Sequence, residues 1–131
     1  MISKGHNKTQ LEKDWLKTVV DFAESTPWLK NKYGAICYPN QFDIDHILGA
    51  KTKRKINGVS CRVGELAIMP IPTPLHNVMS NHKYNRTTQP ANYRSAFGHE
   101  TEVWLSMINT MYMDGYEIPF DDDVINAIIK R

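Results

Sequence analysis

The feature that most constrains the fold of this chain is a set of three prolines at alternate positions, Pro70, Pro72 and Pro74. Proline has no backbone N–H and a fixed φ, so we do not expect a central β-strand to continue through this stretch. The run from Glu65 to Met69 is therefore predicted to be a strand that ends here. Thr73 before Pro74 has the form of a helix N-cap followed by proline, which predicts a short helix from Leu75 to about Asn81.

Strand signals also precede the prolines. Ala35 to Tyr38 is short and β-prone, and from Phe42 to Leu48 apolar residues alternate with polar ones, which is typical of a strand with one buried face. Asn57-Gly58 is a strong hairpin-turn signal. The predicted order is strand, long basic loop, strand, helix.

Helical patterns occupy both ends of the chain. Thr9 and Glu12 have the spacing of a capping box, and apolar residues recur at helical intervals after them. A second pattern runs from His99 to Met113, and a last helix is expected to be capped near Asp121. The sequence thus predicts one α+β domain over residues 1–131, with an N-terminal helix at 9–25, a core at about 35–84 and C-terminal helices at about 90–130. Between Pro90 and Gly98 we expect at most a short helix.

Composition excludes several classes of protein. No apolar run approaches the ~20 residues that span a bilayer, and the N-terminus lacks the apolar region of a signal peptide, so no membrane partner and a cytoplasmic location are expected. Cys37 and Cys61 lie far apart without a CxxC partner, so we expect two reduced core thiols and no cysteine zinc site.

A basic segment follows the second strand signal. Lys51, Lys53, Arg54 and Lys55 put four cations into five positions, although the net charge of the chain is only +2. A flexible lysine-rich loop supplies charge with little fixed geometry, so we expect these four residues to contact DNA phosphates without reading bases. The alternative is a solvated loop without a ligand.

Two groups of residues could carry chemistry. Asp45-His46 ends one predicted strand, and His76, Asn77 and His82 lie on or just after the helix predicted beyond the other strand. Hydrolysis of a phosphodiester needs a base for the attacking water and a cation for the developing charge, and carboxylate and imidazole groups can supply both.

Four blocks carry a resemblance to a known family: Phe42 to Gly49, Glu65 to Ile71, Leu75 to Asn77 and Phe97 to Glu100. Together they look like the HNH (ββα-metal) nucleases of phages and prophages, including the group similar to the Ref-type RecA-dependent recombination nucleases. The resemblance covers about residues 35 to 105. It implies a ββα-metal core, made of a hairpin plus a helix, embedded in several additional helices.

The resemblance also implies roles for the candidate residues. His46 would be the general base that activates water, Asp45 would hold one divalent ion (Mg²⁺, Mn²⁺ or Zn²⁺), and His76 or Asn77 would bind that ion or orient the water. His82 fits a further ligand, although on an unbroken helix it would lie on a different face from His76. The implied partners are DNA and, as a further possibility, a recombinase.

Two departures from the family pattern leave a second function open. Only Cys37 stands near a position of the usual zinc knuckle, with Pro72 and Leu75 at the helix-side positions, and Thr88-Gln89 replaces a His-His pair. The chain is therefore expected to be either a metal-dependent DNA endonuclease of recombination or repair, or a catalytically inactive relative that binds DNA or protein.

Overall fold

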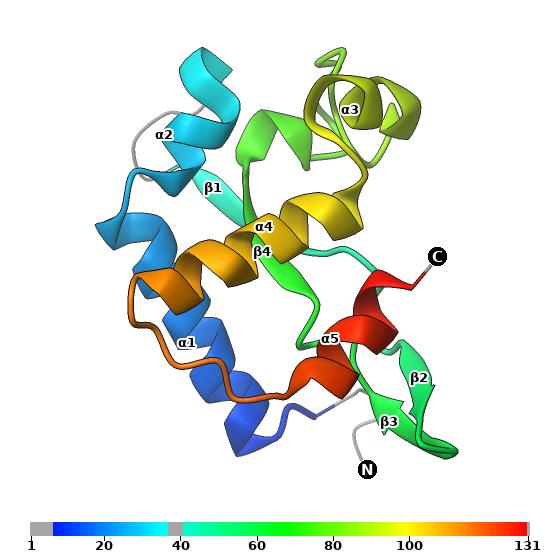
Figure 1. Ribbon diagram of the computed structural model, residues 1–131. Helices are drawn as coiled ribbons and strands as arrows, with labels where there is room; N and C mark the ends of the chain where they lie inside the picture. Colours follow the sequence, from blue (N-terminus) through cyan, green and yellow to red (C-terminus); the bar gives the residue numbers. More distant parts are fainter. Residues whose placement is uncertain (1–6, 37–40, 131) are drawn as a thin grey trace, which may run out of the picture.

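The computed structural model describes residues 7–36 and 41–130, which form a mixed α+β fold (Figure 1). Within these residues there are five α-helices, two antiparallel two-stranded sheets and two short 3-10 helices. The helices are α1 (Gln10–Ser25), α2 (Trp28–Tyr33), α3 (Pro90–Phe97), α4 (Glu100–Met113) and α5 (Asp122–Ile129). The strands and 3-10 helices are β1 (Phe42–His46), β2 (Lys53–Ile56), β3 (Val59–Arg62), β4 (Ile68–Pro72), η1 (Gly34–Ile36) and η2 (Thr73–Leu75).

The central sheet joins β1 to β4, with Asp43 opposite Ile71 and His46 opposite Ile68. The basic segment is not a loop between these strands, because part of it forms its own hairpin, β2–β3. Asn57 and Gly58 turn that hairpin with φ of 53° and 82°, as the sequence predicts for a two-residue turn. The predicted strand from Glu65 to Met69 is wrong in its bounds, since β4 begins at Ile68.

Strand β4 runs through two of the prolines, contrary to the expectation that they end it. The bonds that flank the two strands fix which positions of β4 face β1: Ile47 N–H donates to Ala67 O, and Thr73 N–H donates to Gln41 O. Pro70 and Pro72 occupy the intervening positions, whose nitrogens point away from β1. In a two-stranded sheet that side needs no N–H donor, so both prolines are tolerated.

The helix predicted from Leu75 to Asn81 does not form. The chain makes the single turn η2, with Pro74 in its first turn as expected, and then a series of turns up to α3. Side chains take the backbone groups that a helix would use: Asn85 Nδ2 donates to Pro74 O and Asn77 O, and Asn77 Oδ1 accepts from Met79 N. A ββα core with a helix at this position is therefore not present among the described residues.

The other helix predictions hold in most places. The Thr9–Glu12 capping box is present, α3 is short, and Asp121 caps α5. Helix α2 was not expected. Ala35 and Ile36 lie in η1 and not in a strand, while Cys37 lies outside the described residues. Cys61 is only half-buried on β3, so it is not the core thiol that the sequence suggests.

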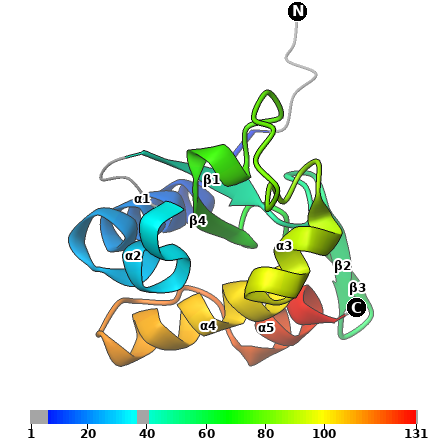
Figure 2. The same cartoon turned by 90° about the horizontal axis from the view of Figure 1, so that it is seen from above.

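The hydrophobic core lies between the helices and strand β4. β4 is buried along its whole length and contacts α1, α2 and α4, and Trp15 Nε1 donates to Leu66 O at 3.0 Å just before it. Phe120 packs on the rings of both Trp15 and Trp104. Figure 2 shows α4 and α5 on one side of the β1–β4 sheet, while the segment between η2 and α3 rises on the other side.

Gly64 fixes how the hairpin returns to the central sheet. A Cβ atom at this position would lie 2.2 Å from Gly49 O and 2.4 Å from Ala50 O, much closer than such atoms approach. Because both neighbours are backbone atoms, a side chain here would displace the turn that follows β1.

Candidate functional site

An aspartate–histidine pair joins the start of β1 to the turn after β4. His76 Nδ1 lies 2.8 Å from Asp43 Oδ2, and Thr73 Oγ1 donates to Asp43 Oδ1 at 3.0 Å. An ionised carboxylate only accepts hydrogen bonds, so it holds the Nδ1–H tautomer and leaves Nε2 as the basic nitrogen. His76 is one-third exposed, which lets water reach it. We call His76 and Asp43 the His76 dyad, and Thr73, which holds Asp43, its brace.

Asp45, two residues further along the same face of β1, is buried and paired with Arg86. The guanidinium binds both carboxylate oxygens, with Nη2 2.6 Å from Oδ1 and Nε on Oδ2. Arg86 also reaches Glu100 through Nη1 at 3.1 Å, and Arg94 binds both oxygens of Glu100 from the solvent side. His76 Nε2 is 3.9 Å from Asp45 Oδ1. The two clusters therefore form one polar site at the edge of the central sheet.

Burial and charge act in opposite directions on Glu100. Burial alone would raise its pKa, but the hydrogen bonds from Arg94 and from its own backbone, with the charges of Arg86 and His99, lower the pKa to about 2. Beside this cluster the hydroxyls of Tyr33 and Tyr93 lie 2.7 Å apart, and burial raises the pKa of both. The two tyrosines are thus neutral structural groups.

His46 belongs to a different pair. Its Nε2 lies 2.8 Å from Glu65 Oε1, and it is about one-third exposed, while Glu65 is buried. Successive strand residues point to opposite faces, so His46 points away from the face that carries Asp45. Asp45 and His46 are expected from the sequence to act together, but their side chains bind different partners, Arg86 and Glu65 respectively.

The remaining candidates make local bonds. Asn77 Oδ1 accepts from Met79 N, and His82 Nδ1 accepts from Tyr84 N at 3.1 Å, with the His82 ring against Tyr84. Of the residues singled out from the sequence, the structure brings Asp45 and His76 together, and leaves His46 and His82 with other partners.

These residues do not fit the divalent ion that the resemblance implies. Arg86 takes both oxygens of Asp45, and His82 Nδ1 is engaged with the backbone. Across residues 7–36 and 41–130, no three His, Cys, Asp or Glu side chains are grouped so that they could hold a metal. An ion at Asp45 would require Arg86 to leave a bidentate contact.

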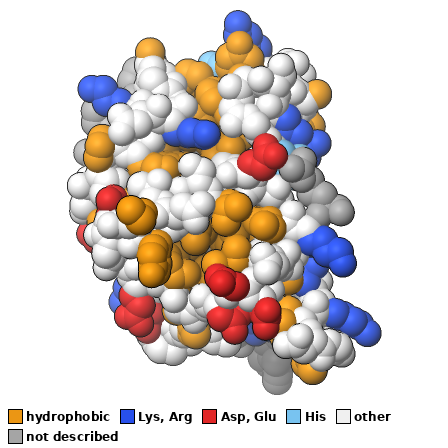
Figure 3. Space-filling model, in the orientation of Figure 1, with side chains coloured by type: hydrophobic (Ala, Val, Ile, Leu, Met, Phe, Trp, Pro, Cys, Tyr) orange, Lys and Arg blue, Asp and Glu red, His pale blue; other side chains and the backbone are white. Residues whose placement is uncertain are grey.

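The basic segment divides into two roles. Arg54 Nη1 donates to Ala127 O at 3.0 Å and to Lys130 O at 2.9 Å, so its charge caps the C-terminal end of α5. Lys51, Lys53 and Lys55 are exposed. Figure 3 shows Lys and Arg side chains along the edge of the molecule where the β2–β3 hairpin lies. Three of the four predicted phosphate contacts remain available.

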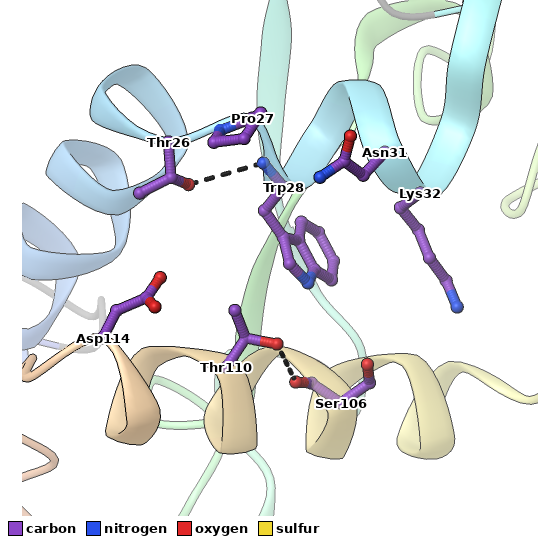
Figure 4. Close-up of a pocket in the computed structure, with 8 residues that line it drawn as sticks. All are labelled: Thr26, Pro27, Trp28, Asn31, Lys32, Ser106, Thr110 and Asp114. Atoms are coloured by element: carbon purple, nitrogen blue, oxygen red, sulfur yellow. Dashed lines mark hydrogen bonds between the residues drawn. The ribbon is translucent and has the colours of Figure 1, made fainter.

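A hollow of about 360 Å³ lies between α2 and α4, away from this site (Figure 4). Hydroxyl groups of Thr26, Ser106 and Thr110 line it, and Thr110 Oγ1 donates to the backbone of Ser106. It contains no histidine and shares no residue with the His76 dyad and its brace or with the Asp45–Arg86–Glu100 cluster.

No protein-family model, curated protein or solved structure matches this chain. None of the described helices is long and apolar enough to cross a bilayer.

Several residues of the site escape sequence reasoning. Arg86 and Asn85 belong to no spacing pattern, and Arg86 lies 41 positions from the carboxylate that it binds. Asp43 lies in the alternating run from Phe42 to Leu48, but nothing in that pattern pairs it with His76. Glu100 stands in the Phe97 to Glu100 block of the resemblance, which could have marked it as a site residue. Asn85 is fully buried and bonds to four backbone groups between Pro74 and Thr88, which fixes the turns around His76.

Proposed function

We propose that this protein is a DNA endonuclease that hydrolyses phosphodiester bonds at the His76 dyad and its brace. The observation that carries the proposal is the chain of contacts from Thr73 to Asp43 to His76, which leaves Nε2 of a one-third exposed imidazole ready to accept a proton. A base oriented by a second group that is itself held is the usual arrangement in general base catalysis.

In the proposed reaction, Nε2 of His76 takes a proton from water as the water oxygen attacks phosphorus. The imidazolium that forms lies 2.8 Å from Asp43, whose carboxylate stabilises its charge. The phosphorus–oxygen bond to one deoxyribose breaks, and the departing oxygen takes a proton from solvent. DNA is the proposed substrate because the β2–β3 hairpin carries three exposed lysines and because the resemblance implies it.

The resemblance assigns the general base to His46, and the His46–Glu65 pair is a second histidine–carboxylate arrangement. We prefer His76 because it adjoins the Asp45–Arg86 cluster and because its aspartate is braced by Thr73. The divalent ion stays a separate prediction of the resemblance, and no step is assigned to it here.

One observation favours the second function, a DNA- or protein-binding role without catalysis. Arg86 neutralises Asp45 where the family would place its ion, as expected if the fold had kept its shape and lost its metal.

Conversion of supercoiled plasmid to nicked and linear forms decides between the two functions. Nicking by the purified protein, measured with EDTA and with added Mg²⁺, Mn²⁺ or Zn²⁺, would support the nuclease proposal, and the EDTA arm tests the need for an ion. Plasmid binding without nicking under every condition would contradict it and favour the binding role.

A further inference from the structure

The segment between η2 and α3 presents two large apolar side chains to solvent. Val78 is 63% exposed, and Met79, at 87%, is the most exposed large hydrophobic residue among those described. Figure 2 shows this segment standing out from the sheet on the side opposite α4 and α5. Its tip lies only two and three residues after His76.

Local hydrogen bonds order the backbone of this tip although it is exposed. Met79 N donates to Asn77 Oδ1 at 2.9 Å, Ser80 N donates to Asn77 O at 2.9 Å, and His82 N donates to Ser80 Oγ at 3.2 Å. Asn85, fully buried, bonds to Asn77 O from below. The backbone of such a turn loses little freedom on binding, so an apolar contact made by its side chains is not offset by ordering of the backbone.

The surroundings of the tip suit a nucleic acid. Lys83 is exposed with its Nζ 4.9 Å from the ring centre of Tyr84, and the His82 ring packs on the same tyrosine. A cation four residues along the same exposed segment from an apolar projection suits a ligand whose phosphates are charged and whose stacked bases are apolar.

We propose that Met79, with Val78 beside it, wedges between stacked bases of the DNA whose phosphodiester lies at His76. The choice of DNA rests on the proposed function. Three residues of chain span at most about 10 to 11 Å, and bases follow one another every ~3.4 Å along a strand. The wedge therefore acts within about three base steps of the bond that is cut. Inserted apolar side chains of this kind unstack and kink duplexes.

A second exposed apolar pair provides a matched control. Tyr112 and Met113, 70% and 81% exposed, lie at the C-terminal end of α4, and Asp114 follows them directly. A carboxylate beside the pair repels phosphate, and Figure 1 shows this end of α4 on the opposite side of the molecule from the segment between η2 and α3. Met113→Ala removes the same side chain from a place where no DNA contact is expected.

The test is the fluorescence of a duplex that carries 2-aminopurine, which brightens when the base is unstacked. It is recorded at saturating protein with EDTA, and a gel checks that the duplex stays intact. We expect a severalfold rise with wild type, Met79→Leu and Met113→Ala, and a rise at least about threefold smaller with Met79→Ala. An equal rise with Met79→Ala, binding without any rise, or no binding would overturn the inference.

The outcome is separable from that of the proposed function. A protein that brightens the duplex through Met79 but never nicks plasmid would refute the catalytic proposal and leave the wedge standing. A protein that nicks plasmid without brightening the duplex would refute the wedge alone.

Discussion

At the scale of single residues, the site depends on how buried carboxylates are matched by cations. Asp45 and Glu100 are 2% and 5% exposed, and Arg86 lies between them with bonds to both. A buried carboxylate that loses its cation cannot recover the solvation it had in the unfolded chain. Arg86 is thus expected to be as important for stability as for the shape of the site.

Arg86→Ala should lower the free energy of unfolding by about 3 to 5 kcal/mol, the cost of leaving a buried charge without its partner. Arg94→Ala removes a similar charge from Glu100, but Arg94 is 45% exposed, so the loss should stay within about 1 kcal/mol. Urea unfolding of both variants measures the difference. Equal losses would show that Arg86 does not hold the cluster.

The lowered pKa of Glu100 predicts that the protein loses stability as the pH falls. Its pKa is about 2 in the folded protein against an ordinary value of 4.5, so it contributes stability above pH 4.5 that is lost as the pH falls toward 2. We expect the difference in unfolding free energy between wild type and Glu100→Gln to shrink by on the order of 2 kcal/mol from pH 5 to pH 2. This figure allows for screening at the exposed Arg94.

The control for that measurement is Glu117→Gln, which changes an exposed carboxylate outside the cluster. Its difference from wild type should stay nearly constant over the same pH range. A Glu100→Gln difference that did not change with pH would contradict the assigned pKa.

At the scale of elements, the β2–β3 hairpin places its cations by strand alternation. Lys53 and Lys55 are exposed, while Arg54 between them bonds to backbone carbonyls at the end of α5 and Ile56 after them is part-buried against the core. The hairpin is thus joined to the C-terminal helix by one arginine and presents its lysines on the other face.

Changing the three exposed lysines to glutamine should weaken DNA binding for every sequence and lower the slope of log K against log salt by about 2 to 3 units. Binding titrations at several salt concentrations measure the slope for Lys51→Gln, Lys53→Gln and Lys55→Gln combined. The matched control changes three exposed lysines of the N-terminal region, Lys8, Lys13 and Lys17. Equal slopes for the two triple variants would remove the hairpin from the DNA interface.

Local signals predicted the elements whose causes are local. The capping box of α1, the Asn57-Gly58 turn and the Asp121 cap involve residues at most three apart, so they can be seen in the sequence. The helix expected after Pro74 failed because Asn85, eleven residues away, takes Pro74 O. The tolerance of β4 for proline depends on its having one neighbouring strand, which the sequence does not reveal.

At the scale of the whole molecule, the site is assembled from distant parts of the chain. β1 supplies Asp43 and Asp45, the turn after β4 supplies His76, and the segments around α3 and α4 supply Arg86 and Glu100. The sequence predicted that Asp45 and His76 belong to one site. It did not predict that Arg86 binds Asp45, because no spacing rule connects residues 41 apart. The aromatic and aliphatic core packs the elements that carry these parts against one another.

The central claim, that cleavage belongs to His76, is tested most directly by plasmid nicking with His76→Ala and His46→Ala side by side. Both residues are about one-third exposed and paired with a carboxylate, so each is a control for the other. Melting curves confirm that both variants fold. Loss of a general base costs at least ~100-fold in rate, and the account predicts that loss for His76→Ala, with His46→Ala within about fivefold of wild type. A large loss of nicking for His46→Ala, with His76→Ala near wild type, would contradict the account and identify His46 as the general base.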